Sequence, residues 1–189
     1  MSPRTTTRTG ERAAALAAHE ARALVAALAI APGEPAGVHE ARKSLRRLRS
    51  LLALARSALG KEAVDPVDGE LRALTKSLSA LRDGQVVLDT AQRMARDAST
   101  PDEAANWEAL LALLSRQQEH RLAEALRDDP GFVRRQALAH RQAERLRQLP
   151  WHRLHGADLR NALARSVQRQ ERAQATALAS GRVDDLHAW

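Results

Sequence analysis

Apolar residues recur at intervals of three and four positions along most of this 189-residue chain. Between residues 38 and 59 the apolar positions with this spacing are Val38, Ala41, Leu45, Leu48, Leu52, Ala55 and Leu59. Because an α-helix has about 3.6 residues per turn, these positions share one face. The spacing therefore predicts a helix that packs through this face.

The same spacing predicts further helices over residues 10–30 and 71–89, and two more begin where proline follows a capping residue, at Thr100-Pro101 and Asp129-Pro130. A last helix is expected over 158–180, closed by Gly181. The segments APGEPAG (31–37) and DPVDG (65–69) are expected to be turns, since they are rich in proline and glycine. In the helix after Thr100 we expect these side chains to be buried: Trp107, Leu110, Leu111, Leu114 and Leu122.

Composition supports a purely helical fold. Hydrophobic residues make up 44% of the chain, and most are alanine and leucine, whereas aromatic residues reach only 2%. Alanine, leucine and arginine favour helices, while strands are enriched in β-branched and aromatic residues. We predict an all-α protein built as antiparallel helical bundles.

Two segments far apart in the chain resemble each other and indicate an internal repeat. ALAIAPGEPAGVHEA (27–41) and ATALASGRVDDLHAW (175–189) both pass from an alanine-rich helix through a glycine-containing loop to an aliphatic-histidine pair. We therefore predict two pseudo-repeats of a four-helix unit, the second incomplete, over 10–97 and 98–189, after a flexible tail at 1–9. An incomplete repeat leaves a leucine groove open, so we expect a collapsed groove or a homodimer.

Basic residues concentrate on one helix. The net charge is +7 with pI ≈ 11.1, and residues 39–49 hold His39, Arg42, Lys43, Arg46, Arg47 and Arg49. Glu40 is the one acid between residues 35 and 61, so we expect little internal ion pairing. Arginines one helical turn apart, about 6 Å, repel one another and suit a linear polyanion.

The helix expected at 71–89 adds Arg72, Lys76 and Arg82 to the basic residues, and Asp83 is placed to orient one of the arginines. In the last helix, Arg160, Arg165 and Arg169 continue the pattern.

The sequence lacks the residues that several kinds of functional site require. Cysteine is absent, which excludes disulfides and zinc-thiolate sites. His152 and His155 have no third ligand nearby, and aspartates sit where loops or helix caps are expected, so we predict no metal, no cofactor and no enzymatic activity. His19, Glu20 and Arg22 interrupt the apolar N-terminal segment, and we expect a cytoplasmic protein with neither a signal peptide nor a membrane span.

Two motifs carry a resemblance to a known family. V-H-x-x-R-K-x-x-R-R-L-R (38–49) and L-R-x-L-x-x-x-L-x-x-L-R-D-x-x-V (71–86) resemble the first half of a CHAD domain, the conserved histidine α-helical domain. The resemblance implies two helical bundles around a basic cavity that binds inorganic polyphosphate without hydrolysing it, in some members at polyphosphate granules. It implies as phosphate contacts His39, Arg42, Lys43, Arg46, Arg49, Lys76, Arg82 and Arg165.

Other readings of the basic face stay open. A helical protein that binds the backbone of nucleic acid would use the same charges, although the chain has only four aromatic residues, Trp107, Phe132, Trp151 and Trp189, for base stacking. A scaffold that binds a partner protein also fits the apolar seams. For His39 we expect protonation at lower pH to strengthen the binding of a polyanion.

Overall fold

All regular structure in residues 4–182, the part of the chain that the computed structural model describes, is helical, which confirms the all-α prediction. The elements in chain order are α1 (Arg4–Ile30), α2 (Pro35–Leu59), α3 (Lys61–Ser77), α4 (Ser79–Ala95), α5 (Pro101–Asp128), η1 (Pro130–Phe132), α6 (Val133–Gln148), η2 (Trp151–Arg153) and α7 (Gly156–Ser180). The repeat comparison rests partly on residues 183–189, which lie outside the described residues.

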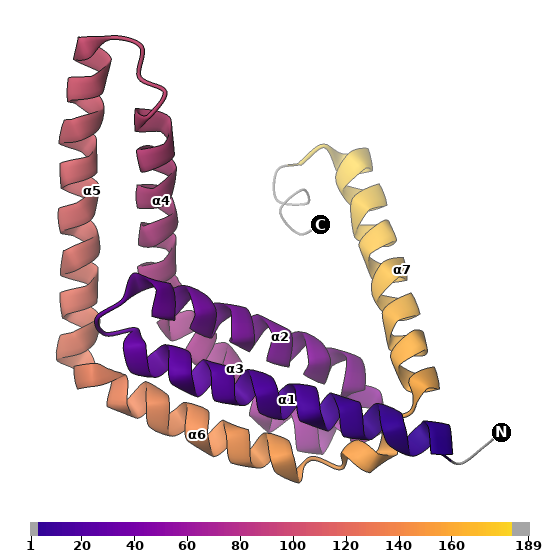
Figure 1. The fold of residues 1–189 in the computed structure, drawn as a ribbon. Helices are drawn as coiled ribbons and strands as arrows, with labels where there is room; N and C mark the ends of the chain where they lie inside the picture. Colours follow the sequence, from indigo (N-terminus) through magenta and orange to yellow (C-terminus); the bar gives the residue numbers. More distant parts are fainter. Residues whose placement is uncertain (1–3, 183–189) are drawn as a thin grey trace.

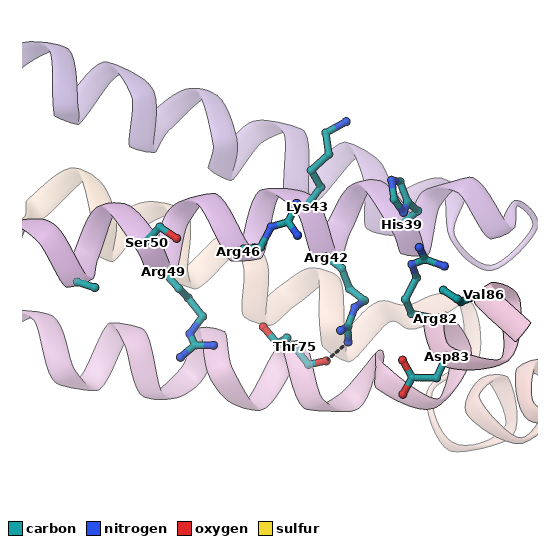
Figure 2. A pocket seen from close by; sticks show the side chains of 11 residues that line it. His39, Arg42, Lys43, Arg46, Arg49, Ser50, Thr75, Arg82, Asp83 and Val86 are labelled. Carbon is teal, nitrogen blue, oxygen red and sulfur yellow. Dashed lines mark hydrogen bonds between the residues drawn. The ribbon is translucent and has the colours of Figure 1, made fainter. Parts of the chain in front are cut away.

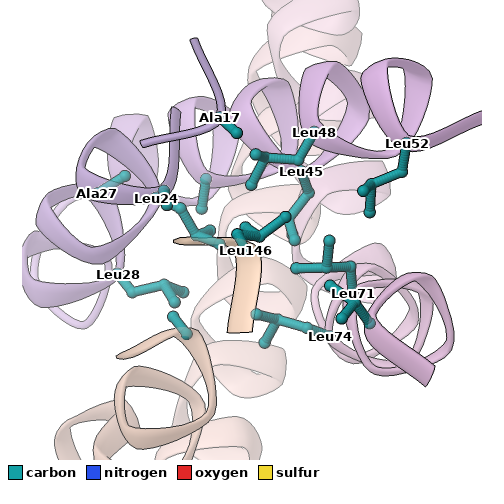
Figure 3. Close-up of a cluster of buried hydrophobic side chains, with 14 of the residues drawn as sticks. Ala17, Leu24, Ala27, Leu28, Leu45, Leu48, Leu52, Leu71, Leu74 and Leu146 are labelled. Carbon is teal, nitrogen blue, oxygen red and sulfur yellow. The ribbon is translucent and has the colours of Figure 1, made fainter. Parts of the chain in front are cut away.

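The body of the protein consists of α1, α2, α3 and α6, which pack side by side (Figure 1). The leucines of the predicted α2 seam are almost fully buried and meet leucines of the other three helices (Figure 3). From the second half of the chain, Phe132, Leu146, Trp151 and Leu154 join the same cluster. The core therefore continues across the expected repeat boundary at 97/98, and the repeat itself stays a prediction.

Two projections leave the body on the same side. Helices α4 and α5 form a two-helix arm at one end, and α7 rises at the other end, with α2 running between them (Figure 1). Helix α5 has no buried residue, and Leu110 is exposed. The expectation that Trp107 and its neighbouring leucines are buried holds only in part, because α5 packs on α4 along the arm and reaches the core only near its end, through Leu122, Ala125 and Leu126.

Gly84 allows the two helices of the arm to approach closely. The residue is buried in α4, and a Cβ atom there would overlap the side chains of Gln118 and Arg121 on α5. Gln118 uses the space to donate a hydrogen bond of 2.9 Å to the Leu81 carbonyl. Glycine lowers helix propensity, but here it makes room for a contact between helices.

Helix α1 begins earlier than expected and is more apolar than expected. It starts at Arg4, so the tail predicted at 1–9 overlaps the helix. Arg8–Ile30 is long and apolar enough to cross a membrane by length and composition, contrary to the sequence expectation, although a core helix or a signal sequence passes the same test. Ala17, Ala21, Leu24 and Leu28 of α1 are buried in the core.

The segment predicted as one helix over 71–89 is two helices that meet at Leu78 (φ −102°, ψ −2°). Around this break, Thr75, Ser77 and Ser79 donate side-chain hydrogen bonds to carbonyls three or four residues earlier. Such bonds compete with the helical pattern, so α4 departs from the line of α3. The DPVDG segment, expected to be a turn, lies within α3, since Val64 and Val67 continue the buried seam of Leu71.

Two other predicted helix ends, at Thr100 and Gly181, are confirmed, whereas α2 begins at Pro35, inside the segment 31–37 that was expected to be a turn, and α7 begins at Gly156 rather than at residue 158. Thr100 caps α5 by accepting a hydrogen bond of 3.2 Å from the Glu103 N–H, and Gly181 closes α7 at φ 60°. Between α5 and α6, buried Asp129 accepts hydrogen bonds from the N–H groups of Arg134 and Arg135. This junction turns the chain from the arm back to the body.

Candidate functional site

Helices α2, α3 and α4 border a cleft of about 630 Å³, which we call the α4-side cleft (Figure 2). The break at Leu78 places the start of α4 beside α2, so that Arg82 extends from α4 toward His39. Its lining residues are His39, Arg42, Lys43, Arg46, Arg49, Ser50, Ala53, Thr75, Arg82, Asp83 and Val86. The structure thus brings together six of the eight side chains implied as phosphate contacts.

The lining of this cleft is strongly positive. Four arginines and one lysine line it together with a single carboxylate, that of Asp83. We expected Asp83 to orient an arginine, but within residues 4–182 it forms no ion pair. Lys43 and Arg49 pair with acids outside the lining, but the positive charge of Arg42, Arg46 and Arg82 is not neutralised within residues 4–182, which favours an anionic ligand.

Arg42 is held in place by neutral oxygen atoms. Its Nη1 donates hydrogen bonds of 2.8 Å to the Ser79 hydroxyl and 3.3 Å to the Thr75 carbonyl. These bonds orient the guanidinium group without neutralising its charge. Arg42 thus presents a positioned cation to the α4-side cleft.

Other basic residues of α2 have acidic partners; within α2 itself only Glu40 supplies one, as expected, and the remaining acids come from neighbouring helices. Lys43 lies 2.7 Å from Glu40, and this hydrogen bond lowers the pKa of the Glu40 carboxyl. Arg49 lies 2.9 Å from Asp68 of α3. The acidic partners lie on α1, on α3 and, for Glu40, one helical turn earlier on α2. Only the pair with Glu40 could therefore be predicted from the local sequence.

Adjacent arginines on α2 face different surroundings. Arg47 does not line the cleft but pairs at 3.1 Å with Glu20, a buried residue of α1. Arg46 lines the cleft, and like Arg82 it has no hydrogen bond or ion pair within residues 4–182. Arg46 and Arg82 are therefore the cations most available to a ligand.

The basic surface continues along α2 beyond the first cleft. The α3-side cleft, of about 470 Å³, shares Arg49 and Ala53 with the α4-side cleft. The α7-side cleft, of about 440 Å³, shares Ala53 and Arg56 with the α3-side cleft and is lined further by Ser57, Lys61, Ala162, Arg165 and Arg169. We call the α2 stripe from His39 to Ser57, with the clefts along it, the basic track.

Two implied contacts lie elsewhere than expected. Arg165 lines the α7-side cleft at the far end of the basic track, away from the His39 end. Lys76 is exposed on α3 and lines none of these three clefts. Its neighbour Thr75 faces the α4-side cleft instead, because adjacent helical residues point about 100° apart.

Sequence reasoning missed several residues of the track. Arg56 lies seven positions after Arg49 on the same face of α2 and could have been found by extending the stripe by two turns. Lys61 follows the end of α2, and its place in the α7-side cleft depends on where α7 packs. Ser79, the partner of Arg42, had no sequence signal because the break at Leu78 was not anticipated.

Within residues 4–182 no group of three or more His, Asp and Glu side chains lies close enough to hold a metal ion. His155 precedes α7 and forms a capping box with Asp158, so its local role is structural.

Comparison with known proteins identifies one family. A family model described as the CHAD domain matches residues 9–189, which is nearly the whole chain. No curated protein and no solved structure matches the chain significantly.

Proposed function

Because this chain belongs to the CHAD domain family, which is known in polyphosphate-binding contexts, we propose that it binds inorganic polyphosphate along the basic track. The observation that carries the proposal is the α4-side cleft, where five cationic side chains and His39 meet a single carboxylate. Family membership makes a binding role the general expectation.

The spacing of the cations suits a linear chain of phosphates. Arg42, Arg46 and Arg49 follow one another at successive turns of α2, about 6 Å and then about 4.5 Å apart along the helix axis. A guanidinium group can donate two parallel hydrogen bonds to phosphate oxygens. Once one phosphate is bound, the next is delivered at high effective concentration, so a long chain binds more tightly than separate phosphates.

We propose binding without hydrolysis. Metal-assisted phosphoryl transfer needs carboxylates that converge on the phosphate, whereas Asp83 is the one carboxylate that lines the α4-side cleft. The cations of this cleft can hold a phosphate chain, while its lining offers no second carboxylate to converge with Asp83 on a metal ion.

Nucleic acid is the second candidate ligand, since its backbone would meet the same charges. Binding of single strands is usually strengthened by stacking of bases on aromatic side chains. Within the described residues no aromatic residue lines the α4-side cleft, and Trp151 and Phe132 are buried in the core. Polyphosphate, which needs no stacking surface, fits this site better.

Calorimetric titration with long-chain polyphosphate, orthophosphate and duplex DNA tests the proposal. We expect polyphosphate to bind most tightly and Arg46→Glu to weaken its binding about ten-fold or more, as expected for reversing a charge at a phosphate contact. Arg141→Glu is the matched control, because Arg141 is exposed on α6 and makes the same change in net charge away from the track. Equal, weak binding of polyphosphate and orthophosphate would overturn the proposal, as would equal losses in the two variants.

A further inference from the structure

The middle of the basic track differs from its two ends. In the α4-side cleft, Arg46 and Arg82 have no acidic partner within residues 4–182, and the same holds for Arg165 and Arg169 in the α7-side cleft. Between these ends, Arg49 and Arg56 each form an ion pair with a carboxylate of α3. The track thus has free cations at both ends and occupied cations in the middle.

The two middle pairs engage the groups that a phosphate would use. Arg56 donates from Nε and Nη2 to the two carboxylate oxygens of Asp65, at 2.5 and 2.6 Å. This is the two-pronged geometry in which arginine also binds phosphate. Arg49 donates from Nε to Asp68 at 2.9 Å, and Arg72 lies 3.8 Å from the same carboxylate.

These pairs are also open to exchange. The side chains of Arg56 and Asp65 are 42% and 48% exposed, and those of Arg49 and Asp68 are 31% and 27% exposed. Ion pairs at exposed positions contribute little net stability. A phosphate chain anchored at both ends of the track would deliver its middle phosphates at high local concentration. A small anion in solution has no such advantage over a carboxylate that is already tethered.

We propose that Asp65 and Asp68 are built-in competitors for the phosphate chain, which occupy Arg56 and Arg49 until an anchored polyanion displaces them. This inference rests on the proposed function. On this inference the two aspartates weaken polyphosphate binding. Ser79 strengthens it instead, because it orients Arg42 without cancelling its charge. The hydrogen bond from Arg56 lowers the pKa of Asp65, which keeps the competitor ionised.

A double-mutant cycle on Arg56 and Asp65 tests the inference, with the dissociation constant of long-chain polyphosphate as the readout. In the wild-type background Asp65 masks Arg56, so Arg56→Gln should weaken binding only about two-fold, a value typical of a weak exposed contact. In the Asp65→Asn background Arg56 is released, and the same change should weaken binding about five-fold or more. Asp65→Asn alone should tighten binding.

Glu62→Gln is the matched control, since Glu62 is exposed on α3, has no ion pair within residues 4–182 and makes the same change in charge. In that background the loss caused by Arg56→Gln should stay at its wild-type size. Melting curves of all variants confirm that the compared proteins are folded.

The outcomes separate this inference from the proposed function. If wild-type protein binds polyphosphate but Arg56→Gln costs the same in both backgrounds, Asp65 acts only by long-range repulsion and the inference is wrong. A larger loss in the wild-type background would mean that Asp65 positions Arg56, which also overturns it. Failure of the wild-type protein to prefer polyphosphate over orthophosphate would remove both proposals together.

Discussion

The guanidinium group of Arg42 on α2 donates a hydrogen bond of 2.8 Å to the hydroxyl of Ser79, the first residue of α4. The same hydroxyl donates a hydrogen bond of 3.2 Å to the Thr75 carbonyl. The bond therefore connects the body to the arm at the point where α3 and α4 separate, and it fixes a cation of the α4-side cleft.

Ser79→Ala should weaken polyphosphate binding about two- to five-fold, because Arg42 loses the hydroxyl that orients it, through a hydrogen bond worth about 1 kcal/mol. Ser77→Ala is the control. The Ser77 hydroxyl accepts a hydrogen bond from Arg135 of α6, which lies outside the α4-side cleft. We expect both variants to lose similar stability in urea and only Ser79→Ala to lose affinity. Equal affinities would show that Arg42 is not positioned by Ser79.

Gly37→Ala should destabilise the protein by about 1–3 kcal/mol, the usual cost of overpacking. A Cβ atom at this position would lie 2.7 Å from the Ala27 carbonyl oxygen and from backbone atoms of Ala31, so α1 and α2 would have to separate. Gly33→Ala provides the comparison, since no atom lies within 4 Å of a Cβ there. Urea unfolding of the two variants checks the prediction, which fails if they are equally stable.

Leu48→Glu should prevent folding, because Leu48 is 1% exposed in the core and its replacement buries a charge. Leu113→Glu should leave the fold intact, because Leu113 on α5 is 57% exposed. Circular dichroism and thermal melting compare the two. Unfolding by Leu113→Glu would indicate that α5 is covered in solution, for example by a second copy of the chain.

Asp129 should make stability depend on pH at the acidic end. Burial raises the pKa of Asp129, but the backbone N–H groups of Arg134 and Arg135 and the Arg135 guanidinium, 2.9 Å away, outweigh this effect and leave the pKa below its ordinary value of 3.8. A carboxyl with a lowered folded-state pKa contributes stability above its unfolded-state pKa and loses it as the pH falls through the folded-state value. We therefore expect this contribution at neutral pH and its loss below about 3.8.

Asp129→Ala should cost about 2 kcal/mol at pH 7, because it removes the cap of α6 and leaves Arg135 unpaired. As the pH falls below about 4, the unfolding free energy of the Asp129→Ala variant should decrease less than that of the wild type. Parallel pH profiles for the two proteins would contradict the assignment.

The sequence by itself determined the all-helical class, the buried face of α2 and the basic stripe. The spacing of Leu45, Leu48 and Leu52 fixes one face of α2, and the angle between successive residues places Arg42 and Arg46 away from it. These features depend on local periodicity, which sequence alone carries. The same holds for the caps at Thr100 and Gly181, where a polar side chain or a left-handed glycine acts within a few residues.

Only the tertiary structure shows which helices and which side chains these faces contact. It separated Arg46 from Arg47, since the first lines the cleft while the second reaches Glu20 of α1, 27 positions earlier. It also showed that the helix expected over 71–89 is interrupted at Leu78, that Arg49 pairs with Asp68, and that Lys76 lies outside the clefts. Periodicity states which residues share a face but not which helix lies opposite, and charge pairing depends on distances between helices. The free and the occupied cations of the basic track could therefore be told apart only after the helices were placed in space.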